Sequence, residues 1–264
     1  MRKLIAQFAL AVFLAGCSQP GPEDAVGTSA PAAVDASIYA DAVANSARPA
    51  ADRARDPGRK PAAVLEFFAI RPGMTVLDLF SGGGYYTEIL AYVVGNNGRV
   101  IAHSNSAYLD FAGDEFEARY AEDRLGNVDI LMAENNELRL EAESLDAILF
   151  VLSYHDIYYA APQRGWPKID GPALLAELGK GLKPGGIVGI VDHYAQAGSP
   201  RETGETLHRI DPAIVIAEMQ AAGFELDASS DVLRNEGDDH SKQVFDPDVR
   251  GQTDRFLLRF KKTD

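Results

Sequence analysis

Short apolar runs alternate with stretches in which apolar residues recur at helical spacing, through most of the chain. Such runs predict buried strands, and the helical stretches predict amphipathic helices that cover them. We expect strands at 74–79, 99–103, 128–133, 144–152, 187–192, 224–230 and 255–260, and helices at 37–47, 61–69, 85–94, 112–124, 172–182 and 212–222. Because strands and helices alternate, the predicted fold is α/β, with a mostly parallel sheet that is buried on both faces.

A glycine cluster follows the first predicted strand. The run that ends near Asp78 continues through Phe80 and Ser81 into Gly82-Gly83-Gly84, and a helical pattern begins at Tyr85. In an open α/β sheet, ligands bind in the crevice beyond the carboxyl ends of the strands. Glycines let a backbone approach the ligand, and a helix N-terminus offers free N–H groups. We therefore expect a nucleotide-like ligand here; the alternative is a strand–helix corner without a ligand.

The turn departs from the fingerprint of dinucleotide-binding proteins. That fingerprint is G-x-G-x-x-G, and here Gly82 and Gly84 fill the first two places while Thr87 fills the third. An acid, Asp78, also precedes the glycines. The pattern therefore indicates a ligand other than a nicotinamide dinucleotide.

This order of residues resembles the class I S-adenosylmethionine-dependent methyltransferases, whose first motif runs acid, x, Gly, x, Gly, x, Gly. Asp78, Gly82 and Gly84 match that motif, and Phe80 replaces its first glycine. The resemblance continues to the end of the chain through Glu134, Ser144-Leu145-Asp146 and Leu182-Lys183-Pro184-Gly185-Gly186. It implies a Rossmann-like, mostly parallel seven-stranded sheet with helices on both faces and an antiparallel last strand. It also implies S-adenosylmethionine as the cofactor.

The resemblance carries cofactor-binding roles onto this chain. Glu134 matches the acid that meets the adenine amino group, whereas Ser104 stands near the position of the family's ribose-binding acid, with Asn105 beside it. A neutral partner forms hydrogen bonds about half as strong as those of a carboxylate. The predicted cofactor-binding residues are Asp78, Phe80, Gly82, Gly84, Tyr85, Ser104, Asn105, Glu134 and Asn135.

Histidines and acids follow the fourth and fifth predicted strands, whose ends converge on the same crevice. They form the pairs His155-Asp156 and Asp192-His193. A histidine that an acid orients can remove a proton from a methyl acceptor. We predict that His155 and His193 are catalytic and that Asp156 and Asp192 orient them; each histidine alone could instead be a hydrogen-bonded structural residue.

A metal site built from histidine and aspartate is a second interpretation of these residues, because imidazole suits zinc, copper, iron and nickel. The chain has no His-x-x-x-His pair and a single cysteine, so no metal ligand is assigned.

The chain is also similar to a narrower group of bacterial proteins described as predicted methyltransferases. The shared blocks are Gly83–Thr87, Tyr154–Asp156, Asp192-His193, His208–Asp211 and Arg250–Phe256. This similarity implies a common fold and site but indicates no substrate.

The first residues have the features of an export signal. A positive start is followed by an apolar run over residues 4–16, which is shorter than the roughly 20 residues of a membrane span. Leu14-Ala15-Gly16-Cys17 resembles a bacterial lipobox, which implies lipidation of Cys17. Ser18 after the cysteine implies the outer membrane of a Gram-negative cell, facing the periplasm. A plain signal peptide with an incidental cysteine is the alternative.

We therefore divide the chain into a lipoprotein signal at 1–17, a flexible linker rich in Pro, Ala, Gly and Ser at 18–36, and a methyltransferase-like domain at 37–264. The net charge of −14 argues against nucleic acid as a partner, because phosphate binding needs a basic surface. The expected function is methylation of a small molecule by a domain tethered to the membrane only through its lipid. The alternative is a non-catalytic envelope protein that reuses the fold to bind a ligand or metal, since a fold does not fix a function.

Overall fold

The computed structural model describes residues 35–263. The predicted signal, Cys17 and nearly all of the predicted linker lie outside the described residues. Within residues 35–263, each helix is too short or too polar to span a bilayer.

A single seven-stranded sheet forms the centre of this part of the chain, with the strand order β3-β2-β1-β4-β5-β7-β6. The strands are β1 (Thr75–Leu79), β2 (Arg99–Ser104), β3 (Val128–Met132), β4 (Leu145–Val151), β5 (Leu182–His193), β6 (Phe224–Ser230) and β7 (Arg255–Lys262). β7 runs antiparallel to β5 and β6, and the pairs among β1 to β5 are parallel. The predicted fold class is therefore confirmed.

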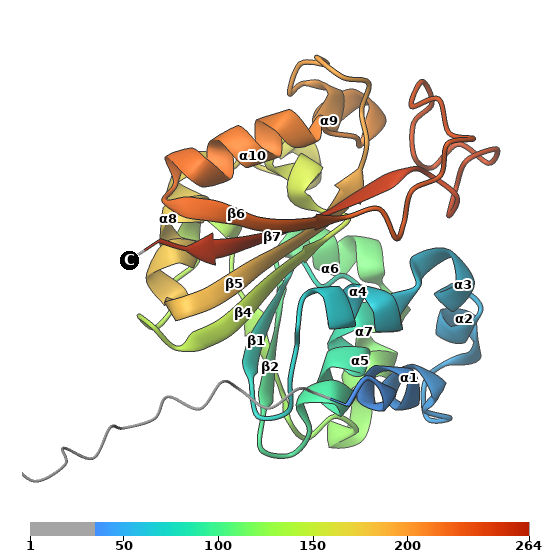
Figure 1. Cartoon of the computed structure of the whole chain (residues 1–264), viewed down its shortest axis with the longest axis vertical. Coiled ribbons are helices and arrows are strands. Elements are labelled where there is room, and N and C mark those ends of the chain that lie inside the picture. Colours follow the sequence, from blue (N-terminus) through green and yellow to red (C-terminus); the bar gives the residue numbers. More distant parts are fainter. Residues whose placement is uncertain (1–34, 264) are drawn as a thin grey trace, which may run out of the picture. The chain divides into compact units, whose positions relative to one another are not determined.

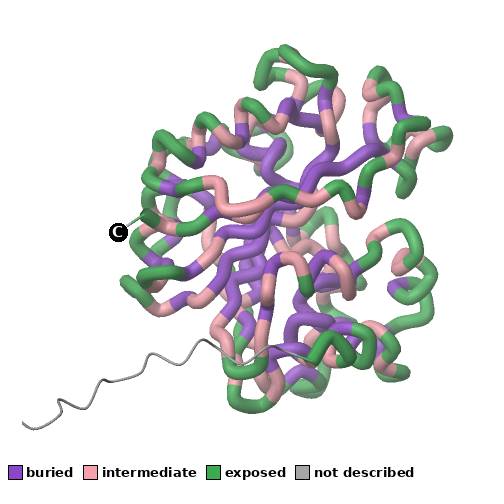
Figure 2. Tube along the Cα trace, in the orientation of Figure 1, coloured by how far each residue is buried: buried purple, intermediate pink, exposed green. Residues whose placement is uncertain are grey.

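Helices cover both faces of the sheet (Figure 1). They are α1 (Ser37–Ala44), α2 (Ala50–Arg53), α3 (Asp56–Arg59), α4 (Pro61–Phe67), α5 (Tyr85–Val94), α6 (Ser106–Ala112), α7 (Asp114–Tyr120), α8 (Gly171–Gly181), α9 (Thr203–Leu207) and α10 (Pro212–Ala221). One apolar cluster packs α1, α4 and α5 against the sheet, and a second cluster packs α8 and α10. The buried residues follow the central strands (Figure 2), as expected for strands that lie between two helical layers.

The segment between β2 and β3 differs from the prediction of one helix at 112–124. It contains α6 and α7, which meet at Gly113, where φ is 50°. α6 begins early because the Asn105 carboxamide oxygen accepts a hydrogen bond from the Tyr108 backbone N–H at 2.7 Å, which caps the helix. The left-handed Gly113 then ends α6 and lets α7 start in a new direction.

Candidate active site

The turn after β1 is built from residues with left-handed backbone conformations. Phe80 has φ 56°, Gly82 has φ 54° and Gly84 has φ 76°. This explains why the resembling family has glycine at the position of Phe80, because a side chain in this conformation costs about 1–2 kcal/mol. Here the buried Phe80 ring stacks on Tyr108, with ring centroids 5.1 Å apart, and that packing offsets the cost.

The glycines of the turn have different neighbours. A Cβ added at Gly82 would meet no atom within 4 Å, whereas one at Gly84 would lie 2.7 Å from the Tyr120 hydroxyl oxygen. α7 therefore covers part of the turn, and its Arg119 Nε donates a hydrogen bond to the Gly83 carbonyl oxygen at 2.8 Å. Of the two glycines predicted to contact the cofactor, Gly82 faces open space and Gly84 allows the close approach of α7.

Asp78 is a buried carboxylate near the end of β1. Its Oδ2 accepts a hydrogen bond from the Thr87 hydroxyl at 2.6 Å, and within residues 35–263 it forms no ion pair. Burial raises the pKa of Asp78 to about 6, although the hydrogen bonds from Thr87 oppose the rise. Tyr85 points elsewhere, since its hydroxyl donates to Asp56 Oδ1 at 2.6 Å.

The predicted nucleoside-binding residues gather at the carboxyl ends of β2 and β3. Glu134 Oε1 accepts from the Ser106 hydroxyl at 2.7 Å, while its Oε2 is buried without a hydrogen-bond partner among the described residues. Asn105 Nδ2 donates a hydrogen bond to Asn135 Oδ1 at 3.1 Å, and Asn105 Oδ1 accepts from the Tyr108 backbone N–H. Both asparagine side chains therefore form hydrogen bonds within the protein.

Ser81 Oγ, Ser104 Oγ and Glu134 Oε2 are buried after β1, β2 and β3 without a partner in the described part of the chain, as are the hydroxyls of Tyr120 and Ser153. Buried polar atoms are nearly always hydrogen-bonded, so an unpaired set calls for an explanation. Two hydroxyls and a carboxylate suit the ribose hydroxyls and the adenine amino group of S-adenosylmethionine. The residues present therefore fit the nucleoside part of this cofactor.

His155 is held between two carboxylates. It lies in the 3-10 helix η3 (Tyr154–Tyr158), directly after β4. Its Nδ1 lies 2.7 Å from Asp192 Oδ1, its backbone N–H donates to Asp192 Oδ2 at 2.9 Å, and its Nε2 lies 3.3 Å from Asp156 Oδ1. Burial alone would lower the pKa of His155, but Asp192 and Asp156 raise it to about 9. His155 is therefore charged at neutral pH.

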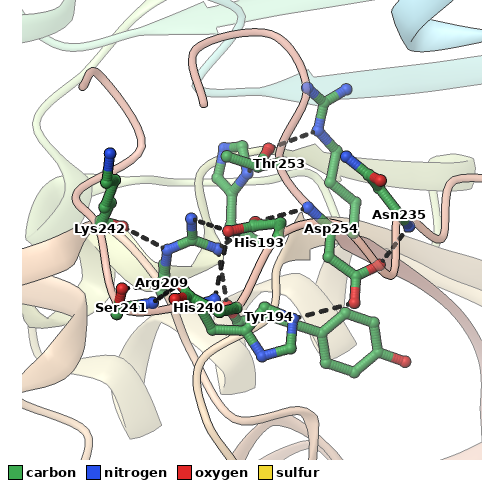
Figure 3. Close-up of polar contacts among 12 residues, drawn as sticks. His193, Tyr194, Arg209, Asn235, His240, Ser241, Lys242, Thr253 and Asp254 are labelled. Atoms are coloured by element: carbon green, nitrogen blue, oxygen red, sulfur yellow. Dashed lines mark hydrogen bonds and ion pairs between the residues drawn. The ribbon is translucent and has the colours of Figure 1, made fainter. Parts of the chain in front are cut away.

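His193, at the end of β5, has the opposite charge state. Its Nδ1 lies 2.7 Å from the Thr253 hydroxyl oxygen, and this oxygen accepts a hydrogen bond from Arg255 Nε at 3.0 Å (Figure 3). Burial and the positive charges of Arg255 and His155 hold the pKa of His193 well below its usual range. The neutral His193 ring and the charged His155 ring lie close together, with centroids 5.9 Å apart.

A third histidine, His208, completes the cluster and was not among the predicted site residues. Its Nδ1 lies 3.5 Å from Asp156 Oδ1, and its ring meets the His155 ring edge-on at 5.3 Å. The remaining oxygen of Asp156 accepts a hydrogen bond from the Tyr108 hydroxyl. His155, Asp156 and His208 each offer a ligand atom within 4.8 Å of the other two, so these three side chains could hold a metal ion. The sequence signal was the His208–Asp211 block, which carried no assigned role.

A buried ion pair supports the segments around His193. Arg209 donates to both oxygens of Asp238, at 2.8 and 3.0 Å, and Asp238 also accepts from the Asp254 backbone N–H at 2.7 Å (Figure 3). Asp254 in turn lies 3.0 Å from His240 Nε2. This network ties the loop between β6 and β7 to the end of β5, so it fixes the position of Thr253 beside His193.

The strand order, the glycine turn and the polar residues at the carboxyl ends of the strands define the class I S-adenosylmethionine-dependent methyltransferase fold. The model of the protein-L-isoaspartate(D-aspartate) O-methyltransferase family matches residues 55–151, which is less than half of the chain. A ubiquinone/menaquinone biosynthesis C-methyltransferase from Shewanella piezotolerans is 27% identical over 129 residues, covering 48% of this chain and 46% of that relative. The chain thus matches about half the length of this curated relative.

Solved structures share the fold. A S-adenosylmethionine-dependent methyltransferase from Aquifex aeolicus aligns with a TM-score of 0.55 and 21% identity, covering 88% of this chain and 100% of that one. A putative sarcosine dimethylglycine methyltransferase from Galdieria sulphuraria aligns with a TM-score of 0.57 and 15% identity, covering 81% and 88%. The predicted resemblance to class I methyltransferases is confirmed, and S-adenosylmethionine is the cofactor that these similarities indicate.

Proposed function

We propose that this chain is a S-adenosylmethionine-dependent methyltransferase that acts on a small-molecule acceptor. The observation that carries the proposal is the set of unpaired buried oxygens on Ser81, Ser104 and Glu134, at the sheet edge where the fold binds its ligands.

The cofactor side of the crevice would use residues of three neighbouring strand ends. Glu134 Oε2 is free to accept from the adenine amino group, and Ser104 Oγ is free to bond a ribose hydroxyl. Gly82 leaves space for a close approach of the ligand, and Asp78 offers a carboxylate beside it. When bound, S-adenosylmethionine supplies an electrophilic methyl group on a sulfonium.

The acceptor side would use the two histidines after β4 and β5. His193 is neutral and has a ring nitrogen that can accept a proton, whereas the charged His155 has none. The nearby cations make His193 a weak base, so it suits an acceptor whose proton becomes acidic as the methyl group is transferred. The carboxylate of Asp192 fixes the ring of His155, and Asp156 flanks it. We assign proton removal to His193 and positioning of the acceptor to His155.

Calorimetry with the purified protein tests cofactor binding. S-adenosylmethionine and its demethylated product should both bind, and no heat at near-millimolar ligand would refute the proposal. Glu134→Gln should weaken binding about tenfold, because it removes one charge-assisted hydrogen bond of about 1.5 kcal/mol. Glu137→Gln is the matched control: Glu137 is exposed three residues away and should bind like the wild type. Equal affinities of the two variants would show that Glu134 does not contact the adenine.

The export signal leads to a proposal about location. We infer that the protein is lipidated on Cys17 and anchored to the outer membrane, facing the periplasm, because residues 4–17 resemble a lipoprotein signal. Labelled palmitate should enter the wild-type protein and not Cys17→Ala. Labelling of both would refute the anchor.

A non-catalytic envelope protein is the second candidate, favoured by export away from the cytoplasm where the cofactor is made. It predicts that the protein binds S-adenosylmethionine or another ligand but releases no demethylated product with any panel of phenols, thiols and amines. Product release with any member of the panel would exclude it.

A further inference from the structure

We propose that His155, Asp156 and His208 form a binding site for a divalent transition-metal ion at the acceptor end of the crevice. The function proposed above assigns no metal, and the sequence brings only two of these three residues together. The third arrives from the end of α9, far along the chain.

The separations between the candidate ligand atoms suit a metal ion. Asp156 Oδ1 lies 3.3 Å from His155 Nε2 and 3.5 Å from His208 Nδ1. Bonds of about 2.0–2.2 Å in a tetrahedral site place neighbouring ligand atoms about 3.3–3.6 Å apart. The two separations that involve Asp156 therefore already suit a tetrahedral site. The ligand atoms of His155 and His208 lie within 4.8 Å of each other. His208 is the most exposed of the three, with 16% of its side chain accessible, so its ring has room to close that edge.

Two further side chains orient the first ligands. His155 Nδ1 lies 2.7 Å from Asp192 Oδ1, and its Nε2 lies beside Asp156. Because the ring is charged without the metal, the ion takes the place of the Nε2 proton, which is released to solvent on binding. Asp156 uses its other oxygen to accept from the Tyr108 hydroxyl. Metal-binding histidines nearly always donate their second ring N–H to a carboxylate, a backbone carbonyl or water, and ligating carboxylates are likewise hydrogen-bonded.

His208 is held in place at an energetic cost. Its φ is 53°, in the left-handed region that non-glycine residues rarely occupy. Its ring packs between Tyr159 and Phe245, with centroids at 5.2 and 5.1 Å. Residues with unfavourable backbone conformations cluster at functional sites, because only the surrounding structure holds them there.

The ligand set selects the class of ion. Two imidazoles and one carboxylate suit zinc, iron, cobalt or nickel, whereas magnesium and calcium prefer oxygen ligands. Three protein ligands leave one position open, as in catalytic sites. If the proposed methyltransferase function is correct, a hydroxyl or thiol of the acceptor would take that position; binding of the ion itself does not depend on that function.

Cobalt titration of the purified full chain, stripped with a chelator, tests the site. Co²⁺ should bind once per chain and give the visible bands of four- or five-coordinate cobalt, and Zn²⁺ should displace it and raise the melting temperature. His208→Asn, which tolerates the left-handed backbone, should lower affinity at least 100-fold. Asp192→Asn should lower it about 10- to 100-fold, as expected for a residue that orients a ligand.

His240→Asn is the matched control. His240 also has a left-handed backbone, with φ 64°, and also lies beside a carboxylate, Asp254, at 3.0 Å. This variant should bind cobalt like the wild type.

The proposal is overturned if wild-type protein binds no Co²⁺ at 0.1 mM, or if His208→Asn and His240→Asn bind cobalt equally. If His208→Asn does not fold, the cobalt spectrum of the wild-type protein and the change in its melting temperature with zinc test the site. Metal binding without any heat from S-adenosylmethionine would refute the methyltransferase and leave the metal site standing.

Discussion

Replacing Asp78 by asparagine should make the protein more stable at neutral pH while weakening cofactor binding. Asp78 is 3% exposed and has no cationic partner among the described residues, so its charged form lacks both water and a counter-charge. Burial raises its pKa from 3.8 to about 6. At about 1.36 kcal/mol per pH unit, ionised Asp78 lowers the free energy of unfolding by about 3 kcal/mol above pH 6. Asparagine keeps an oxygen that can accept from the Thr87 hydroxyl and carries no charge.

The pH dependence follows from the direction of the shift. A group whose pKa is higher in the folded than in the unfolded state binds its proton more tightly when folded. The protonated Asp78 side chain therefore makes its full contribution to the free energy of unfolding below about pH 4, and this contribution is lost as the pH rises through about 6. The advantage of Asp78→Asn should therefore be about 3 kcal/mol at pH 7.5, shrink through this window, and vanish near pH 4.

Urea denaturation at pH 4.5, 6 and 7.5 measures these differences through the transition midpoints. Asp129→Asn is the control: Asp129 is exposed on β3, and its replacement should change stability by less than about 0.5 kcal/mol at each pH. An Asp78→Asn variant that is no more stable than wild type at pH 7.5, or equally favoured at all three pH values, would refute the reasoning. Calorimetry of the same variant should show weaker binding of S-adenosylmethionine.

Three further substitutions test other parts of the molecule. Glu88→Gln should destabilise the protein by about 3–5 kcal/mol in urea denaturation, because a fully buried carboxylate pairs with two arginines there; a loss below 1 kcal/mol would contradict this. Asp192→Asn should lower the pKa of His155 from about 9, because Asp192 is the main group that raises it, and an unchanged imidazole titration by NMR would contradict this. Phe80→Gly should lose about 2–4 kcal/mol, since the lost ring packing exceeds the relief of about 1–2 kcal/mol at a left-handed residue; a gain in stability would show that strain dominates.

The sheet could be predicted from the sequence because buried strands have a strong local signal. Residues 224–230 form β6 as predicted, and the expected strand at 144–152 is β4 at Leu145–Val151. Both are short apolar or alternating runs with clear ends. The expected strand at 187–192 instead begins at Leu182, because Leu182 pairs with Leu145 of β4; Lys183–Gly186 then form an irregularity before pairing resumes between Ile187 and Ala147. Turn residues in a sequence do not reveal whether the residue before them already pairs with the neighbouring strand.

The segment after β2 could not be predicted to the same degree. Its apolar pattern suits one helix at 112–124, but the capping oxygen of Asn105 starts a helix earlier and Gly113 divides the segment. The sequence predicts a ribose contact for Asn105, because this residue stands near the position of the family's acid. A side chain that caps a helix and one that binds a ligand look the same in a sequence, since both need a short polar group after a strand.

The histidine cluster shows most clearly what the sequence withholds. Asp192 precedes His193 in the chain, yet its carboxylate binds the ring of His155, because successive residues of a strand point to opposite faces of the sheet. The neighbour that His193 actually uses is Thr253, at the start of β7. As a result, one histidine lies between two carboxylates and is charged, while the other lies near two cations and is neutral. Two His/Asp pairs that are equivalent in the sequence therefore have different chemistry: only His193 can accept a proton, and only His155, with Asp156 and His208, directs a ring nitrogen at a carboxylate and a second imidazole.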